Sequence, residues 1–152
     1  MSYSRRSFIK NTGLLATGAM LASNGLFAGS KMKNFGLQLW SVRDDLAKDP
    51  KEVLKQVSSY GYTQIESFEG AKGMFWGMSA MEFKALMDDL GMKIISSHCN
   101  IGKDFEKKAA DAASIGMKYL ICPFKGPQKS IDNFKKFADE FNEKGEICRR
   151  NG

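Results

Sequence analysis

The sequence predicts an α/β fold made of consecutive βα units that pair into a parallel sheet. Apolar, strand-like runs alternate with helical stretches about every 25–30 residues, a spacing typical of βα units. The junctions between units resemble one another, because each has a glycine, one apolar residue and then a strand-like run. A doubly wound sheet usually carries a glycine-rich phosphate-binding loop after its first strand, and the first run here has none.

The first unit starts with an apolar run over residues 35–40, and its helix follows a clear start signal. Asp49 is placed to cap the helix, Pro50 suits the first helical position, and Glu52 completes the capping pattern. Apolar residues then recur at helical spacing up to Gly61, which is expected to end the helix.

The next two units repeat this design. Ser79 and Glu82 form a second capping box, and Gly91 ends the helix that it starts. A third helix is expected from Phe105 to Gly116, with alanines on its apolar face. The further strand-like runs cover residues 63–68, 93–98 and 118–123.

The fourth helix is expected to begin at Ser130 and to run past Gly145 to the end of the sequence. Its apolar residues recur at helical spacing, so they are expected to face inward. These residues are Phe134, Phe137, Ala138 and Phe141.

Repetition of one unit favours a closed barrel over an open sheet. A complete (β/α)8 TIM barrel needs ~250 residues, about twice the length that these four units occupy. The sequence therefore predicts that residues 31–152 are the N-terminal half of such a barrel, with only the first four βα units present. The alternative is a complete α/β domain of four units.

Composition limits the classes of partner. The chain has 152 residues with 23 Lys and Arg against 17 Asp and Glu, but Arg5, Arg6 and Lys10 lie in a stretch without acids. The remaining excess is too small for a phosphate-binding groove, so no nucleic-acid partner is expected. Three cysteines give no CxxC pair, and a single histidine excludes a histidine-rich metal cluster.

The N-terminus has the features of an export signal. Ser4 to Lys10 (SRRSFIK) matches the twin-arginine pattern, and an uncharged, moderately apolar stretch follows up to Phe27. This stretch is interrupted by glycines and is too short for a membrane span, so no stable membrane anchor is expected. Residues 1–30 are therefore predicted to be a twin-arginine signal peptide that sends the protein to the periplasm through the twin-arginine export machinery. The alternative is an amphipathic first helix of the fold.

The chain resembles the sugar phosphate isomerase/epimerase family, the xylose-isomerase-like TIM barrels. Three segments carry the resemblance: residues 35–44 (FGLQLWSVRD), 61–66 (GYTQIE) and 96–98 (SSH). It implies a sugar substrate and metal-dependent isomerisation or epimerisation by proton transfer next to a carbonyl. It also implies a divalent ion (Mn, Mg, Co or Zn) whose ligands lie on later strands and are absent from this chain, which alone is expected to be inactive.

Working groups in such a barrel sit at the carboxyl ends of the strands. Glu66, near the end of the second run, is a candidate for binding sugar hydroxyls or for proton transfer, with a structural ion pair as the alternative. His98 ends the third run and is a candidate for proton transfer, hydroxyl binding or ligation of a second metal, with a structural role as the alternative.

Two residues after the first run are candidates for substrate binding. Trp40 offers an apolar face to a sugar ring, with core packing as the alternative. Arg43 suits a phosphate or carboxylate, with an ion pair to a neighbouring aspartate as the favoured alternative. The loop over residues 74–78 is expected to be either a lid or a cover of the barrel end. Cys99 and Cys122 are expected to be two buried thiols rather than a disulfide.

Two other functions remain open. One is a metal-dependent abasic-site endonuclease of the same fold, which the weak positive charge disfavours. The other is a non-catalytic exported sugar-binding protein. Half a barrel also leaves two strand edges open, through which copies of the chain could pair, so a homo-oligomer is one expectation for the assembly.

Overall fold

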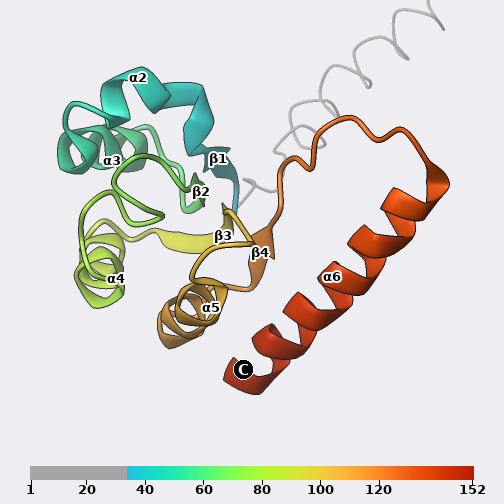
Figure 1. The fold of residues 1–152 in the computed structure, drawn as a ribbon. Coiled ribbons are helices and arrows are strands. Elements are labelled where there is room, and N and C mark those ends of the chain that lie inside the picture. Colours follow the sequence, from blue (N-terminus) through green and yellow to red (C-terminus); the bar gives the residue numbers. More distant parts are fainter. Residues whose placement is uncertain (1–33) are drawn as a thin grey trace, which may run out of the picture. The chain divides into compact units, whose positions relative to one another are not determined.

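The computed structural model describes residues 34–152, so the predicted signal peptide lies outside the described part. Its four strands form one sheet in the order β1-β2-β3-β4, and every neighbouring pair is parallel (Figure 1). The strands are β1 (Gly36–Gln38), β2 (Gln64–Phe68), β3 (Lys93–His98) and β4 (Tyr119–Ile121). The predicted arrangement of four sequential βα units is confirmed.

Helices follow each strand. After β1 the chain forms a short 3-10 turn, η1 (Leu39–Val42), and then two helices, and one helix follows each later strand. Figure 1 shows α3, α4 and α5 one after another beside the strands. The helices are α2 (Arg43–Leu46), α3 (Pro50–Ser59), α4 (Ala80–Asp89), α5 (Phe105–Ser114) and α6 (Ile131–Asn151).

The predicted N-caps form in both α3 and α4, but the capping-box acid predicted at Glu52 makes no bond back to Asp49, so only α4 has the complete box. The Asp49 side chain accepts a hydrogen bond from the backbone N–H of Glu52 at 3.1 Å. Ser79 and Glu82 form the complete capping box, with the Ser79 N–H donating to the Glu82 carboxylate at 2.7 Å. These bonds satisfy backbone donors that the helix itself leaves free. The capping signals therefore place both helix starts within a residue of their predicted positions.

The core lies between the sheet and helices α3 to α5. Ile65 of β2 and Ile94 of β3 are buried on the side of the sheet that the helices cover. Leu54 of α3 and Phe83 and Met87 of α4 are almost inaccessible to solvent. Burial of a side chain of this size contributes about 1.5–3 kcal/mol, so these helices are fixed to the sheet mainly by packing.

The first strand is shorter than the run over residues 35–40 predicted. The Gln38 side chain accepts a hydrogen bond from the backbone N–H of Trp40 at 2.5 Å, which starts η1 and takes the chain out of the sheet. The last strand is likewise limited to Tyr119–Ile121 instead of residues 118–123. The Gln38 cap thus ends β1 early, although the apolar run over residues 35–40 predicts a longer strand.

The prediction that the apolar residues of α6 face inward is wrong. Phe134 is 56% exposed and Phe141 44% exposed, and no residue of α6 is fully buried. The helix packs mainly against α5, and near its C-terminal end Ile147 and Cys148 meet the core. No described strand lies beyond β4, so the first half of α6 has no sheet beneath it. No helix within residues 34–152 is long and apolar enough to cross a membrane.

Candidate functional site

Polar side chains gather on the face of the sheet opposite the helices, which we call the inner face. Side chains alternate along a strand, so Ile65 and Ser67 of β2 point to the helices while Glu66 and Phe68 point to the inner face. Gln38 of β1 pairs with Glu66 in the sheet and therefore lies on the same face. The inner face thus brings residues from separate units side by side.

A β-bulge in β3 decides which residues join this face. Ile65 pairs with Ile94, but the next pair is Glu66 with Ser96, so β3 carries one extra residue, Ile95. A bulge redirects the side chains that follow it. Ile94 therefore stays in the core, and Ser96 is turned toward Glu66.

Glu66, Ser96 and His98 form a cluster of polar side chains on the inner face. The Ser96 hydroxyl donates to Glu66 Oε2 at 2.6 Å, and His98 Nε2 lies 3.2 Å from Glu66 Oε1. The side chains of His98 and Glu66 are 30% and 27% exposed, so the pair is partly shielded and still accessible. The structure thus brings together the two residues predicted as catalytic, and Glu66 has both a structural partner and an accessible position.

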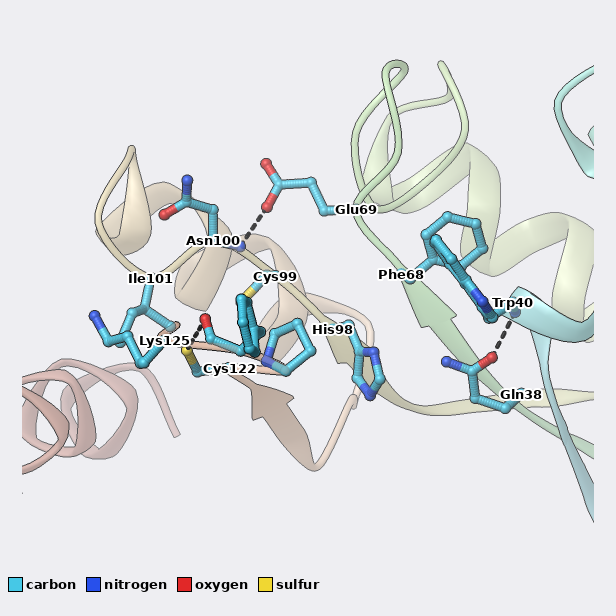
Figure 2. A pocket seen from close by; sticks show the side chains of 12 residues that line it. Gln38, Trp40, Phe68, Glu69, His98, Cys99, Asn100, Ile101, Cys122 and Lys125 are labelled. Atoms are coloured by element: carbon cyan, nitrogen blue, oxygen red, sulfur yellow. Dashed lines mark hydrogen bonds between the residues drawn. The ribbon is translucent and has the colours of Figure 1, made fainter. Parts of the chain in front are cut away.

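A pocket of about 750 Å³ lies at the carboxyl ends of the four strands (Figure 2). His98 lines the pocket, whereas Glu66 does not. The volume suits a small organic ligand, and the position is the one at which α/β barrels bind substrates. The lining comes from all four strand ends: Gln38, Trp40, Phe68, Glu69, His98, Cys99, Asn100, Ile101, Cys122, Pro123, Phe124 and Lys125.

Trp40 forms part of the pocket wall. Its ring meets Phe68 edge-on, with centroids 5.0 Å apart, and is 55% exposed, which excludes simple core packing. Arg43 lies over the Trp40 ring at 5.1 Å and donates to the Trp40 carbonyl at 3.0 Å. Arg43 also pairs with Asp44 at 3.8 Å and does not line the pocket, so it supports Trp40 instead of facing a ligand.

An ion pair at the pocket rim was not predicted from the sequence. Lys108 Nζ lies 2.8 Å from Glu69 Oε1 and also donates to the Asn100 carbonyl at 2.8 Å. Glu69 Oε2 accepts from the Asn100 backbone N–H at 2.7 Å, a bond visible in Figure 2. The pair therefore joins the segment after β2 to the segment after β3, next to His98. Glu69 directly follows a predicted strand, but its partner Lys108 is 39 residues away, and no sequence pattern connects the two.

The loop over residues 74–78 covers the core. Met74, Phe75 and Trp76 are each at most 6% exposed, which favours the cover over the lid. Cys99 and Cys122 are free thiols as predicted, but only Cys99 is buried, whereas Cys122 is partly exposed and lines the pocket. Burial raises the pKa of Cys99 to about 12 although Lys108 opposes this shift, so the thiol is protonated at neutral pH and is a poor nucleophile.

The described residues do not fit a metal ion. Within residues 34–152 no group of three or more His, Cys, Asp or Glu side chains is arranged to hold one. Glu66 and His98 lie close together, with facing atoms 3.2 Å apart, but they are only two side chains. A structural zinc site takes four protein ligands and a catalytic one three.

Two solved structures are similar to this chain. A sugar phosphate isomerase/epimerase from Parabacteroides distasonis ATCC 8503 matches with 30% identity and a TM-score of 0.67, over 79% of this chain and 51% of that chain. A second sugar phosphate isomerase/epimerase from the same organism matches with 24% identity and a TM-score of 0.63, over 82% and 50%. No protein-family model and no curated protein matches.

This chain therefore spans about half the length of the solved proteins that it matches. The likeness confirms the predicted fold class, the xylose-isomerase-like barrel, over four βα units. Both neighbours also carry the family description that the resemblance predicted.

Proposed function

We propose that these βα units supply the sugar-binding and proton-transfer residues of a sugar isomerase or epimerase. The observation that carries this proposal is the contact between Glu66 and His98 on the inner face, with His98 lining a pocket at the strand ends. Isomerisation and epimerisation both move a proton next to a carbonyl, which requires a positioned acid or base. The likeness to two sugar phosphate isomerase/epimerase structures supports this reaction class.

His98 is the group that we assign to proton transfer, because it reaches the pocket while Glu66 does not. Glu66 is a positioning residue: its carboxylate faces Nε2 of the imidazole at 3.2 Å and orients the ring. The Ser96 hydroxyl holds the other carboxylate oxygen, which fixes the Glu66 rotamer. The remaining ring nitrogen of His98, Nδ1, then takes or returns the proton.

A sugar fits the remaining lining of the pocket. Trp40 offers an exposed aromatic surface for the apolar face of a sugar ring. Gln38 and Asn100 add side-chain amides, which pair with hydroxyl groups. Small-molecule sites of this kind combine apolar walls with a few placed polar groups.

The divalent ion implied by the resemblance has no place in this mechanism. We propose that any Mn, Mg, Co or Zn ion used by the complete activity is held by residues other than those described. The described residues would then serve the substrate alone, and no step above depends on the ion.

We also propose that residues 1–30 direct export to the periplasm. The support is the paired Arg5 and Arg6 followed by an uncharged stretch. Replacing both arginines by lysine is expected to leave the protein in the cytoplasm, as measured by cell fractionation. Periplasmic recovery of the double variant would contradict this proposal.

The proposed function is tested with ketoses as probes. His98 is the single histidine, so its ring signals in NMR report on the site directly. Addition of a ketose is expected to shift the signals of His98 and of the Trp40 indole. Incorporation of deuterium from D2O next to the ketose carbonyl tests proton transfer, a partial reaction that requires no complete turnover.

His98→Asn is expected to abolish this exchange, whereas Gln64→Ala leaves it unchanged. Gln64 is a matched control, since it lies on the inner face at the opposite end of β2 and outside the pocket. Ketose binding without exchange would favour the non-catalytic sugar-binding alternative. The absence of any shift at His98 would overturn the proposal.

A further inference from the structure

We infer that Trp76, a buried residue that does not line the pocket, is the positioning residue for Trp40. Trp76 lies on the segment after β2 and is 6% exposed, whereas Trp40 lies in η1 and faces the pocket. The two rings do not need to touch, because Phe68 lies between them and contacts both.

Trp76 is itself held in one orientation. Its indole Nε1–H donates to the Ser67 hydroxyl at 3.3 Å, and this hydroxyl donates to the Met74 carbonyl at 2.9 Å. Ser67 is completely buried, so water does not compete for these bonds. The backbone of Trp76 has a φ of 56°, a left-handed conformation that is uncommon for a bulky residue. Strained positions of this kind persist only where the surroundings determine them, and they concentrate at functional sites.

The segment around Trp76 is shaped to fit the indole. A Cβ atom at Gly70 would lie 3.0 Å from Cη2 of Trp76, so any larger residue would displace the ring. Gly70 and Gly73 pair through their backbones, which closes the loop against the indole. The ring position is therefore set by contacts on several sides.

Edge-to-face contacts with Phe68 couple the orientation of the Trp76 ring to that of the Trp40 ring. Trp76 meets Phe68 with centroids 4.8 Å apart at an interplanar angle of 78°. Phe68 meets Trp40 at 5.0 Å and 71°. Such contacts depend on angle as well as distance, because the ring edge is positive and the ring face negative. Rotation of Trp76 would therefore change the surface that Phe68 offers to Trp40.

Trp40 depends on this support because it has few alternatives. More than half of its surface is exposed, and its other aromatic-face partner is the guanidinium of Arg43, whose side chain is itself 45% exposed. Without the wall formed by Phe68, several side-chain rotamers of Trp40 become accessible. The contacts between Trp40, Phe68 and Trp76 thus connect the sugar-binding surface of the proposed function to the buried core.

The experiment compares three variants of the full chain. Trp76→Phe removes the indole N–H, and Ser67→Ala removes its acceptor while keeping both tryptophans. Phe75→Leu is the matched control: Phe75 is equally buried in the same loop, but it packs on Phe83 at 5.6 Å and not on Phe68. Chemical denaturation of all three measures the general loss of stability.

The first readout is the NMR signal of the Trp40 indole, together with the quenching of tryptophan fluorescence by acrylamide. The chain has two tryptophans, so Trp40→Phe assigns the signals and Trp76→Phe isolates Trp40. We expect the Trp40 NMR signal to move in Trp76→Phe and Ser67→Ala and to stay unchanged in Phe75→Leu. Quenching is compared only among the wild type, Ser67→Ala and Phe75→Leu, which retain both tryptophans, and is expected to rise only in Ser67→Ala. The second readout is ketose affinity, which rests on the proposed function and is expected to fall about threefold to tenfold in the first two variants.

Each outcome decides the inference. An unchanged Trp40 signal in Ser67→Ala, which retains both rings, would overturn it. So would an equal change in Phe75→Leu, since that would indicate general loosening. A Trp40 signal that moves as expected in a chain that binds no ketose would support the inference and refute the proposed function.

Discussion

The first three βα units and the fourth unit differ in what lies beneath their helices. α3, α4 and α5 each bury apolar residues against the sheet, whereas α6 buries none. Yet α6 is the longest described helix, with apolar residues at the same helical spacing. Helical periodicity therefore predicts that a helix forms, but burial of its apolar side requires a partner strand. The comparison can be tested by matched substitutions in the two regions.

The largest difference is expected between two phenylalanines. Phe83→Ala in α4 removes a completely buried ring and is expected to lower the free energy of unfolding by about 3–5 kcal/mol. Phe134→Ala in α6 removes a ring that is 56% exposed and should change it by less than about 0.5 kcal/mol. Urea denaturation of both variants measures the difference. Equal losses would show that α6 is packed as tightly as α4.

The next largest effect is expected within α5, where neighbouring lysines have different partners. The Lys108 side chain is 13% exposed and pairs with Glu69, so Lys108→Met leaves a shielded carboxylate without its cation and is expected to cost about 2 kcal/mol. Lys107 pairs with Asp111 from a side chain that is 76% exposed. Lys107→Met should therefore cost at most about 0.5 kcal/mol. Thermal unfolding measures both, and a reversed order would contradict the assigned role of Lys108.

A smaller effect is expected at the helix starts. Ser79→Ala breaks the capping box of α4 and is expected to cost about 1 kcal/mol. Ser130 precedes α6 without a side-chain capping bond, so Ser130→Ala should be close to neutral. Helical circular dichroism during urea titration follows both variants. A larger loss of helical stability for Ser130→Ala than for Ser79→Ala would contradict the uncapped start of α6.

The smallest effect is the pH dependence of the same capping box. The backbone N–H of Ser79, aided by its hydroxyl, holds the pKa of Glu82 below its ordinary value of 4.5. The stabilisation is therefore complete above pH 4.5 and is lost as the pH falls through the lowered pKa of the folded state. The stability difference between the wild type and Glu82→Gln should shrink with acidification. A difference that grows toward low pH would contradict this assignment.

Sequence reasoning succeeds here where the signal is local. The caps at Asp49 and Ser79 are read from neighbouring residues, and the order of strands follows from the repeated junctions. Glu66, His98 and Trp40 were chosen as candidates because working groups of α/β barrels lie at strand ends. Local sequence patterns thus predict the order of the strands and some of the residues at their carboxyl ends.

Features that depend on distant residues were missed. Lys108 reaches Glu69 only after the chain folds, and nothing near either residue indicates the pair. The extra residue in β3 looks like ordinary strand sequence, since Ile95 continues an apolar run. The exposure of α6 depends on the extent of the sheet, which periodicity does not report. These misses share one cause: they are properties of contacts between units and not of single units.

The bulge at Ile95 lets β3 carry one residue more than β2 and still place Ser96 and His98 on the inner face beside Glu66 and Phe68. Residues before it, such as Ile94, are constrained by helix packing, and those after it, such as Ser96 and His98, by the ligand side. If β3 kept Ile95 but ran as a regular strand without the bulge, Ser96 and His98 would turn to the helix side, and the imidazole would be buried among apolar residues. Protein engineers can therefore vary the inner-face positions after the bulge, Ser96 and His98, for new ligand chemistry while keeping Ile94 and Ser97, which are buried on the helix side.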